Sequence, residues 1–336
     1  MRFALIGAGV IGAVHARLVE ALGDDAALAA VVDRDLDRAG KLVAQYGGRA
    51  YATPAEAYAA EEIDAVGICL PSALHADAAV EALRAGKHVL IEKPVDITLE
   101  AADRVIEAQK ATGLTVSVVS QRRFQPAVAQ IRAAIDTGAL GRVTSGLAES
   151  AFFRPQSYYD GDGWRGTLAI DGGGALMNQG IHALDLLVWM LGRPVQVTAQ
   201  TARLAHEGID VEDLAGASIL FESGAIGMTL ASTAAYPGRP VRLTIHGDQG
   251  TAVLDDDELA YFAAADAEAP EAPTLAGPDG WSPTELAHLA QYRDFVDAAR
   301  EGRPPAVTLE AGRRSLATVL AVYESARTGR PVDLED

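Results

Sequence analysis

The sequence predicts an α/β protein in which a doubly wound parallel sheet precedes an α+β domain with a large open, mainly antiparallel sheet. Short apolar runs alternate with helical segments over residues 1–120, as in a parallel sheet covered by helices on both faces. Segments of alternating polarity joined by short turns prevail afterwards, as in antiparallel strands. We therefore expect two domains, residues 1–120 and 121–336, with the option that the final helices pack back on the first.

Composition narrows the class of protein. The chain has 336 residues, 49% of them hydrophobic, which suits a globular fold of two domains. A formal net charge of −18 disfavours nucleic acid and anionic membranes as partners, because both are polyanions. Cys69 is the only cysteine, so an intrachain disulfide is excluded. We expect a cytoplasmic protein with no membrane-spanning helix, whose N-terminal segment belongs to the fold and is not a signal peptide.

The elements of the first domain follow from the apolar runs. Buried strands are predicted at FALI, AAVV, DAVGICL, KHVLI and LTVSVV, with helices between them. Thr53, Pro54 and Glu56 form a capping box with proline at the first helical position. Thr98 precedes a further helix, which Gly113 ends.

The second domain begins with a helix and a strand. Alternating segments then predict strands at VQVTAQTARL, AGASILFE, AIGMTLAST, VRLTIHG and GTAVLD. Residues 263–283 are rich in Ala and Pro and are interpreted as a surface excursion. Asp255–Glu258 is expected to form a solvated hairpin turn and not a calcium site. The helices expected in this half lie at 126–136, within the glycine-rich stretch from 172, near 284–300 and near 309–328.

A glycine-rich turn follows the first strand. The motif Gly7-Ala8-Gly9-Val10-Ile11-Gly12 lies between a strand and a helix, which is the context of a dinucleotide-binding site. Gly7 permits the tight turn, Gly9 lets the backbone approach a pyrophosphate, and Gly12 allows close packing of helix and strand. The phosphates are expected at the helix N-terminus, where free amides and the helix dipole favour anions.

Asp33 ends the second strand, 21 positions after Gly12. A carboxylate there accepts hydrogen bonds from ribose hydroxyls and repels a 2′-phosphate, so NAD is favoured over NADP. Arg34 weakens this argument for NAD, because an arginine can stack on adenine or pair with the 2′-phosphate of NADP. The alternative is a plain glycine turn with Asp33 capping the next helix.

Lys93 follows the fourth predicted strand in the sequence His88-Val89-Leu90-Ile91-Glu92-Lys93-Pro94. Ligands of doubly wound sheets bind beyond the carboxyl ends of the strands, so Lys93 is expected at the cofactor crevice. Its charge would orient a substrate hydroxyl. The alternative is a surface lysine paired with Glu92.

The stretch GGGALMNQGIHALD carries the polar residues of the predicted substrate site. At 100° per residue, Asn178, His182, Asp185 and Trp189 share one face of a helix. This face has no Lys, Glu or Arg, so a lined pocket is favoured over a solvated surface, and the glycines would let a ring or a sugar come close. The residues expected to face the core are Gly180, Leu184, Leu187, Val188 and Leu191.

His182 is the predicted acid/base. An imidazole, with an unperturbed pKa of about 6.5, accepts a proton near neutrality, while the carbon of the same alcohol passes a hydride to a nicotinamide. Asn178 would hold this hydroxyl or an adjacent one. Asp185 either fixes the tautomer of the imidazole or has a structural role. No metal is predicted, because His182 and Asp185 lack further ligands at suitable spacing.

Together, GAGVIG, AGKHVLIEKP and GGGALMNQGIHALD resemble the Gfo/Idh/MocA family of NAD(P)-dependent oxidoreductases over nearly the whole chain. The resemblance implies a Rossmann domain and an α+β domain whose open sheet mediates dimers or tetramers. It implies sugars, inositols, their acids or nucleotide-linked sugars as substrates. Lys93 and His182 match the family's lysine and acid/base, whereas Asn178 stands where inositol-dehydrogenase-like members often have aspartate.

The segments SQRRFQP, RPQSYYDGDGWRGT, GIDVED and STAAYPG resemble a subgroup of UDP-sugar-acid 3-dehydrogenases. The cofactor contacts implied by these resemblances are Leu70, Pro71, Ser72, His75, Glu92, Lys93, Gln121, Arg122, Trp164 and Arg165. The implied substrate contacts are Lys93, Arg122, Arg154, Tyr158, Asn178, His182 and Tyr236, with Tyr159 as a further candidate for either.

Three functions compete at this point. The first is an NAD-dependent dehydrogenase acting on a secondary alcohol of a sugar or cyclitol. The second is a glycoside hydrolase that uses NAD transiently, by oxidation, elimination and return of the hydride. The third is a non-catalytic NAD-sensing regulator, which the presence of both Lys93 and His182 disfavours.

Overall fold

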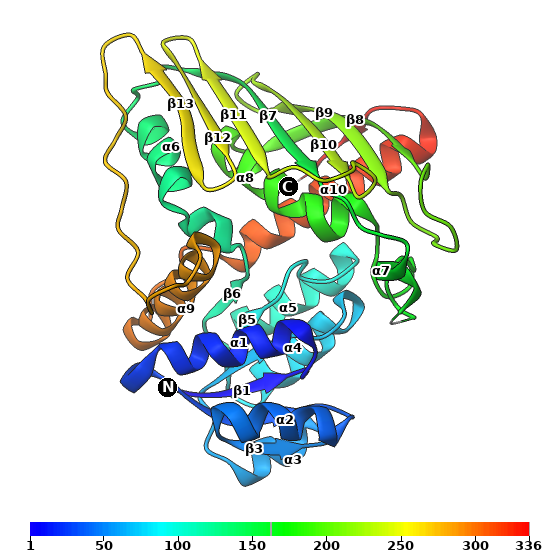
Figure 1. Ribbon diagram of the computed structural model, residues 1–336, viewed down its shortest axis with the longest axis vertical. Helices are drawn as coiled ribbons and strands as arrows, with labels where there is room; N and C mark the ends of the chain where they lie inside the picture. Colours follow the sequence, from blue (N-terminus) through cyan, green and yellow to red (C-terminus); the bar gives the residue numbers. More distant parts are fainter. Residues whose placement is uncertain (162, 336) are drawn as a thin grey trace. The chain divides into compact units, whose positions relative to one another are not determined.

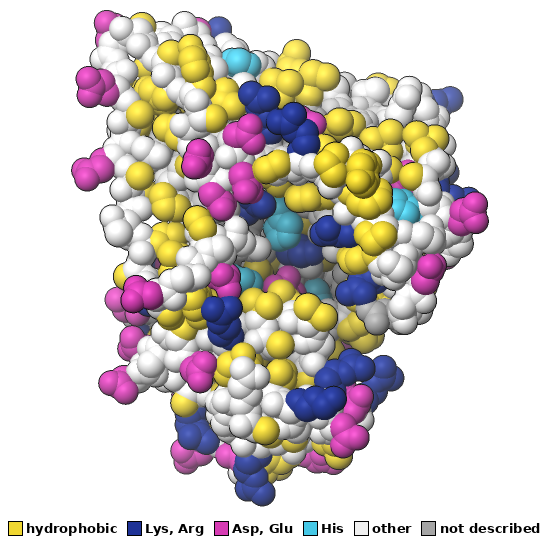
Figure 2. Space-filling view, viewed as in Figure 1, with side chains coloured by type: hydrophobic (Ala, Val, Ile, Leu, Met, Phe, Trp, Pro, Cys, Tyr) yellow, Lys and Arg dark blue, Asp and Glu magenta, His cyan; other side chains and the backbone are white. Residues whose placement is uncertain are grey.

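The computed structural model describes residues 1–161 and 163–335. It divides into two compact units (Figure 1). The first contains Met1–Gln121 and Ala276–Arg313, and the second contains Arg122–Leu275 and Arg314–Asp336. On the face drawn in Figure 2, acidic side chains are spread over both units, in keeping with the strongly negative charge.

The first unit contains a six-stranded parallel sheet in the order β3-β2-β1-β4-β5-β6. This is the strand order of a dinucleotide-binding sheet, with its switch point between β1 and β4. All five predicted strands are present, and the three-residue β3 was not predicted. The strands are β1 Arg2–Ile6, β2 Ala27–Val32, β3 Arg49–Tyr51, β4 Ala65–Ile68, β5 His88–Ile91 and β6 Val116–Val118.

Two helices of the first unit, α3 and α5, begin at the predicted signals, and α5 ends at its predicted glycine. Thr53 caps α3 by accepting from the N–H of Glu56, and Thr98 caps α5 by accepting from that of Ala101. Gly113 ends α5 in the left-handed conformation, with φ +68°. The helices are α1 Val10–Ala21, α2 Leu36–Tyr46, α3 Pro54–Ala60, α4 His75–Arg84, α5 Leu99–Thr112 and α9 Pro283–Glu301, with short turns at Gly23–Asp25 and Ser72–Leu74.

Helix α9 completes the core of the first unit from a distant part of the chain. It contacts α1 (Figure 1), and its Tyr292 and Phe295 rings lie 5.8 and 6.1 Å from the Phe3 ring. Phe3, Tyr292 and Phe295 have no solvent exposure. Burial of each such aromatic side chain stabilises the fold by roughly 1.5–3 kcal/mol.

The second unit contains an eight-stranded sheet in the order β13-β12-β11-β7-β10-β9-β8-β14. Its neighbours are antiparallel except β7 and β10, which run parallel. The predicted mainly antiparallel sheet is confirmed, while β13 and β14 were not predicted. The strands are β7 Val143–Ala151, β8 Pro194–Ala202, β9 Leu214–Phe221, β10 Ile226–Ser232, β11 Arg242–Gly247, β12 Gly250–Asp255, β13 Glu258–Ala264 and β14 Val332–Asp333.

The glycine-rich stretch of the second unit is not one regular helix. Ala175–Gly180 forms a π-helical segment, η4, and α8 continues as a regular α-helix from Ile181 to Leu191. Residues 265–282 form neither helix nor strand, as the predicted surface excursion requires. The remaining helices are η3 Gln121–Phe124, α6 Pro126–Asp136, α7 Ser157–Asp160 and α10 Leu309–Thr328. Among the described helices, none has the length and apolar character needed to cross a bilayer.

Candidate functional site

The glycine-rich turn has the geometry that a pyrophosphate requires. Gly7 has φ +104°, and a Cβ on it would lie 2.4 Å from the carbonyl oxygen of Cys69. A Cβ on Gly12 would lie 2.1 Å from the carbonyl oxygen of Gly7, so the helix packs directly on the turn. A Cβ on Gly9 would meet nothing within 4 Å. Gly9 therefore borders open space at the N-terminus of α1, where a phosphate can approach the backbone.

Asp33 is tied to this turn. One carboxylate oxygen accepts from the backbone N–H of Ala8 at 2.8 Å, and the other accepts from that of Asp35 at 2.9 Å. The cap of α2 is Asp35, which accepts from Asp37 and Arg38, so the interpretation of Asp33 as the helix cap is wrong. Asp33 is half-buried and Arg34 is exposed. This placement fits a carboxylate that meets the adenosine ribose.

The turns after β4 and β5 are joined by His75. This ring is 1% exposed, and its nitrogens lie 2.6 Å from the carbonyl oxygen of Pro94 and 2.8 Å from that of Leu70. Both nitrogens are therefore occupied by backbone, and the ring orders the two turns instead of offering a polar atom to a cofactor. Ser72 is buried, while Pro71 is half-buried.

Lys93 follows β5 at its carboxyl end and is half-buried. Its backbone N–H donates to Oε2 of Glu92 at 3.1 Å. Glu92 itself is 6% exposed, and its Oε1 is bonded to His15 on helix α1. The carboxylate before Lys93 is thus an interior group of the first unit.

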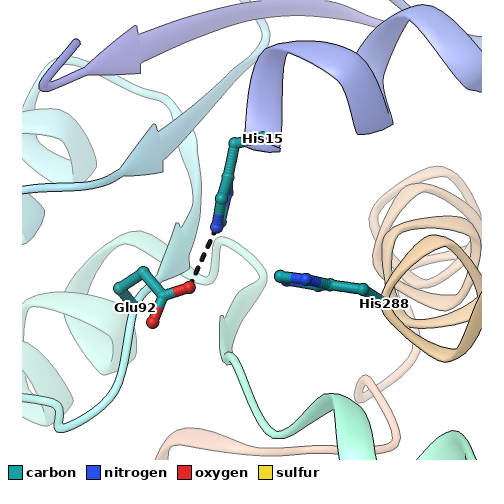
Figure 3. Close-up of side chains that lie close together, drawn as sticks. All are labelled: His15, Glu92 and His288. Atoms are coloured by element: carbon teal, nitrogen blue, oxygen red, sulfur yellow. Dashed lines mark hydrogen bonds and ion pairs between the residues drawn. The ribbon is translucent and has the colours of Figure 1, made fainter. Parts of the chain in front are cut away.

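Figure 3 shows His15, Glu92 and His288 converging from helix α1, the end of β5 and helix α9. Nε2 of His15 lies 2.9 Å from Oε1 of Glu92, and Nδ1 lies 2.6 Å from the hydroxyl of Tyr292. The His288 ring makes an edge contact with the His15 ring at 5.1 Å. We refer to these four residues as the α1–α9 cluster.

The electrostatics of the α1–α9 cluster favour one buried ion pair. Burial lowers the pKa of His15, but Cys69 and Glu92 outweigh it and raise this pKa to about 10. Burial raises the pKa of Glu92, but the hydrogen bond and charge of His15 outweigh it and hold this pKa well below its usual range. Burial, assisted by the nearby His15, lowers the pKa of His288 to about 3. At neutral pH, His15 is cationic, Glu92 anionic and His288 neutral.

His15, Glu92 and His288 form the one group of potential metal ligands within the described ranges, with ligand atoms within 4.8 Å of one another. Both ring nitrogens of His15 are already bonded, to Glu92 and Tyr292. A metal ion could bind His15 only after one of these hydrogen bonds is broken and the imidazole has lost a proton. The arrangement therefore suits an internal ion pair better than a cation site.

In the second unit, the burial pattern confirms only part of the predicted polar face of the glycine-rich stretch, because Asp185, expected on that face, is buried with 5% exposure. Within Ala175–Leu191, which the structure describes throughout, only Asn178, His182 and Trp189 are half-buried and every other residue is buried. The predicted core-facing residues are among the buried ones. The π-helical segment changes the helical phase before His182, yet these three side chains remain partly open to solvent.

Asn178 is held by a residue that sequence reasoning missed. Its amide nitrogen donates to Asp171 at 2.9 Å, and the other oxygen of Asp171 accepts from the N–H of Gly166 at 3.0 Å. Asp171 is 2% exposed. A carboxylate therefore lies beside position 178, although residue 178 is itself an amide. Asp171 lies seven positions before Asn178 and precedes the helical segment, so the periodicity of that segment could not predict it.

The glycines of this stretch are required by protein packing. A Cβ on Gly173 would lie 2.3 Å from the hydroxyl of Tyr323, and one on Gly174 would lie 1.8 Å from the carbonyl oxygen of Glu212. A Cβ on Gly180 would lie 2.5 Å from that of Ala231. The expectation that these glycines open the backbone to a sugar is corrected: they admit neighbouring protein.

Glu212 caps the start of the π-helical segment from a distant part of the chain. Its carboxylate accepts from the N–H groups of Gly174 and Leu176 and from the hydroxyl of Tyr323, each at 2.9 Å. Burial raises the pKa of Glu212, although these hydrogen bonds oppose the shift. A negative group at this helix terminus complements its free amides.

Asp185 has structural partners. Its carboxylate accepts from Nε and Nη2 of Arg123 at 2.7 and 2.6 Å, and from the hydroxyl of Ser315 at 2.7 Å. The residue is 5% exposed. Of the two roles left open by the sequence, these contacts support the structural one.

Two arginines flank the ring of Tyr158. The guanidinium carbon of Arg165 lies 4.7 Å from the ring centroid and that of Arg154 lies 5.3 Å from it. Among the described residues, Nε of Arg154 is buried without a hydrogen-bond partner. Arg165 also stacks on Trp164 at 5.0 Å. We call Arg154, Tyr158, Trp164 and Arg165 the arginine–tyrosine cluster.

Other predicted contacts lie in different surroundings. Tyr159 is 7% exposed and donates to the hydroxyl of Thr233 at 3.0 Å, so it belongs to the core and not to a binding surface. Tyr236 is 81% exposed and makes an edge contact with Phe153. Arg122 is half-buried, 3.9 Å from Asp256 in the turn between β12 and β13. The side-chain oxygen of Gln121 is buried and has no hydrogen-bond partner in the part of the chain that the structure describes.

The run Asp255–Glu258 forms the predicted hairpin turn between β12 and β13. Asp256 lies at its tip with φ +55°. Asp257 accepts a hydrogen bond from Gln125, and Asp256 lies near Arg122, so two carboxylates of the run contact the protein and the turn is half-buried instead of fully solvated.

Comparison with protein families matches both parts of the chain. Residues 1–120 match the oxidoreductase family with an NAD-binding Rossmann fold. Residues 128–253 match the GFO/IDH/MocA C-terminal domain. The two matches together span most of the chain.

Individual relatives align with this chain over nearly its full length. An inositol 2-dehydrogenase of Rhizobium meliloti is 30% identical, covering 99% of both chains. A myo-inositol 2-dehydrogenase of Thermotoga maritima is 28% identical, covering 100% of this chain and 99% of the relative. The crystal structure of the WlbA dehydrogenase from Bordetella pertussis, in complex with NADH and UDP-GlcNAcA, is 31% identical with a TM-score of 0.88, covering 100% of this chain and 99% of that one.

Proposed function

The chain belongs to the Gfo/Idh/MocA family and is an NAD-binding oxidoreductase of the sugar or inositol dehydrogenase type, and from this premise we propose that it transfers a hydride between a secondary alcohol of a sugar, inositol or sugar derivative and NAD. The observation that carries the proposal is the burial pattern of Ala175–Leu191. Asn178 and His182 remain partly open on a segment that is otherwise almost wholly buried. A base and a hydrogen-bonding amide kept at such a face suit an alcohol substrate.

The residues around Gly9 fit NAD. Open space at Gly9, the helix N-terminus behind it and Asp33 beside Ala8 supply places for a pyrophosphate and a ribose. NAD supplies the hydride acceptor when it is bound. Asp33 would hold the ribose hydroxyls and disfavour NADP. The backbone of the glycine turn would hold the phosphates.

We assign the reacting roles to three side chains. His182 takes the hydroxyl proton as general base and returns it in the reverse direction as general acid. Lys93 orients the same hydroxyl and favours loss of its proton through its positive charge. Asn178, whose amide orientation is held by Asp171, holds this hydroxyl or its neighbour. An uncharged Asn178 leaves proton transfer to His182.

The arginine–tyrosine cluster supports an acidic carbohydrate as substrate. Two guanidinium groups face one phenol ring, and one buried N–H of Arg154 has no acceptor within residues 1–161 and 163–335. A carboxylate would supply the missing acceptor and balance the positive charge, while the aromatic faces suit the sugar ring. We propose a carboxylated or nucleotide-linked sugar. The WlbA dehydrogenase was crystallised with a ligand of this class, UDP-GlcNAcA.

The test is a screen of NAD reduction across inositols, aldoses, uronates, UDP-linked sugar acids and glycosides, with NADP in parallel. We expect NADH to form with a sugar acid. His182→Ala should lower kcat by about 100-fold or more, the usual range for loss of a general base, while NAD affinity is retained. Unchanged turnover in this variant would overturn the mechanism.

Two outcomes of the screen would replace the proposal. Glycoside cleavage without net NADH would indicate transient oxidation and elimination. NAD binding with no turnover on any sugar would indicate a cofactor-sensing protein.

We also propose that the protein forms a homodimer or homotetramer through the outer face of the second sheet. Five exposed apolar side chains share this face: Met228 lies opposite Leu147, Ile226 opposite Leu220, and Leu230 two residues beyond Met228. Each is 41–54% exposed. A contiguous apolar patch on a sheet is typical of an interface, and a second copy presents the same patch for a two-fold contact.

A further inference from the structure

The backbone of Lys93 is held on both sides by a buried histidine acting through a neighbour. On one side its N–H donates to the Glu92 carboxylate, whose other oxygen is bonded to His15. On the other side the carbonyl of Pro94 is bonded to His75. The sequence motif that contains Lys93 is thus anchored at the residue before and at the residue after the lysine.

We propose that His15 is a positioning residue for Lys93, because it holds the Glu92 carboxylate that receives the Lys93 backbone N–H. The role rests on the proposed function of Lys93. His15 has no solvent exposure, so its ring touches no substrate and acts only through Glu92. Its effect on catalysis is therefore one of placement and local charge.

Hydrogen bonds at both nitrogens fix the orientation of the His15 ring. Its Nε2 is bonded to Glu92 and its Nδ1 to the hydroxyl of Tyr292 on α9. Because His15 lies on α1, whose N-cap is Gly9, the ion pair joins the helix that is expected to bind the phosphates to the end of β5. The placement of the lysine thus depends on the element that is expected to hold the cofactor.

Loss of the imidazolium would change Glu92 and, through it, Lys93. A buried carboxylate without a cation either takes up a proton or draws in water. A protonated Glu92 is a poorer acceptor for the Lys93 N–H, and it withdraws the negative charge that lies near the lysine. Both changes move the lysine away from the geometry that orients a hydroxyl.

The experiment compares three variants of the full-length protein. His15→Met removes both hydrogen bonds and the charge. His15→Gln places an amide nitrogen where Nε2 lies and so retains a donor toward Glu92. His288→Phe is the matched control, because this ring contacts His15 from the same cluster but has no hydrogen bond to Glu92 among the described contacts.

We expect His15→Met to lower kcat by about 10-fold or more, since a displacement of ~1 Å in an active site can cost about 100-fold. His15→Gln should recover part of this loss. The Kd for NAD should change less than threefold in each variant, and His288→Phe should keep kcat within about threefold of wild type. Equal kcat values in His15→Met and His288→Phe would overturn the proposal.

Tyr292→Phe is a second, milder variant for the case in which His15→Met does not fold. It removes the hydroxyl bonded to Nδ1 and leaves the ion pair, so kcat should fall by about two- to fivefold. An unchanged kcat in both Tyr292→Phe and His15→Gln would also contradict the positioning role.

A chemical readout separates this inference from the proposed function. The rate at which acetic anhydride modifies Lys93, followed by mass spectrometry, should rise at least about twofold in His15→Met, because loss of the Glu92 charge disfavours the ammonium form. An altered rate in a protein without sugar-dependent turnover would support the positioning and defeat only the dehydrogenase proposal. An unaltered rate in an active enzyme would defeat the positioning alone.

Discussion

The guanidinium of Arg123 donates two parallel hydrogen bonds to the carboxylate of Asp185, at 2.7 and 2.6 Å, and both residues are less than 10% exposed. This pair joins η3 to helix α8, three residues after His182. The position of His182, the proposed base, therefore depends on a buried ion pair of the second unit.

Removing one partner of this pair should be costly. Arg123→Met should lower the free energy of unfolding by about 3–5 kcal/mol, because it removes the guanidinium that donates two hydrogen bonds to a buried carboxylate. The double variant Arg123→Met/Asp185→Leu should recover more than half of the loss. Urea unfolding of the three proteins measures this, and a single variant as stable as wild type would contradict it.

Gly180 should tolerate no side chain. Gly180→Ala places a Cβ 2.5 Å from that of Ala231, so we expect a loss of about 1–3 kcal/mol from overpacking. Gly40→Ala is the matched control, because Gly40 also lies in a helix but its Cβ would meet nothing within 4 Å. That control should gain about 0.5–1 kcal/mol. Thermal unfolding distinguishes the two, and similar shifts in both would refute the packing argument.

Asp33 should decide the choice of cofactor. Asp33→Ser removes the charge that repels a 2′-phosphate, so the ratio of kcat/KM for NAD over NADP should fall by about 10-fold or more, an electrostatic change of roughly 1.4 kcal/mol. Arg34→Ala is the control for the neighbouring charge and should weaken use of NADP only. Kinetics with both cofactors give the answer, and an unchanged ratio in Asp33→Ser would argue against the ribose contact.

The buried ion pair of the α1–α9 cluster predicts a pH-dependent stability. The pKa of His15 is raised from 6.5 to about 10, so its stabilising contribution is complete below about pH 6.5 and is lost as pH rises through about 10. The pKa of Glu92 is lowered, so its contribution is lost only in strong acid.

The difference in unfolding free energy between wild type and His15→Met should therefore shrink between pH 7 and pH 10. Urea unfolding at several pH values measures it. His288→Phe should show no such alkaline trend relative to wild type, because His288 is neutral in the folded protein above its lowered pKa. A constant difference for His15→Met across this range would mean that the imidazole is not cationic.

The apolar face of the second sheet should control assembly. Met228→Glu places a charge at the centre of the patch formed with Leu147 and Leu230, so it should shift the protein toward monomers. Leu36→Glu is the control, because Leu36 is 51% exposed on α2 and lies outside the patch. Light scattering coupled to size exclusion reports the mass. A monomeric mass for the wild-type protein would contradict the proposed assembly.

Much of the fold was predictable from local patterns. A parallel sheet and an antiparallel sheet differ in apolar periodicity, and Thr98 and Gly113 are helix signals that act over a few residues. The strands β3, β13 and β14 escaped prediction because they are short or weakly alternating and depend on their neighbours for pairing. The π-helical segment was not predicted, because the local pattern indicated one regular helix over this stretch.

The sequence by itself determined the two sheets, the glycine turn and the candidate reacting residues Lys93, Asn178 and His182, because these depend on residue type at fixed spacing. Tertiary structure alone decided what surrounds them. His15 meets Glu92 across 77 positions and Asp171 meets Asn178 outside any helical repeat. Such partners are selected by burial, because a polar group withdrawn from water must find its hydrogen bond wherever the folded chain brings one.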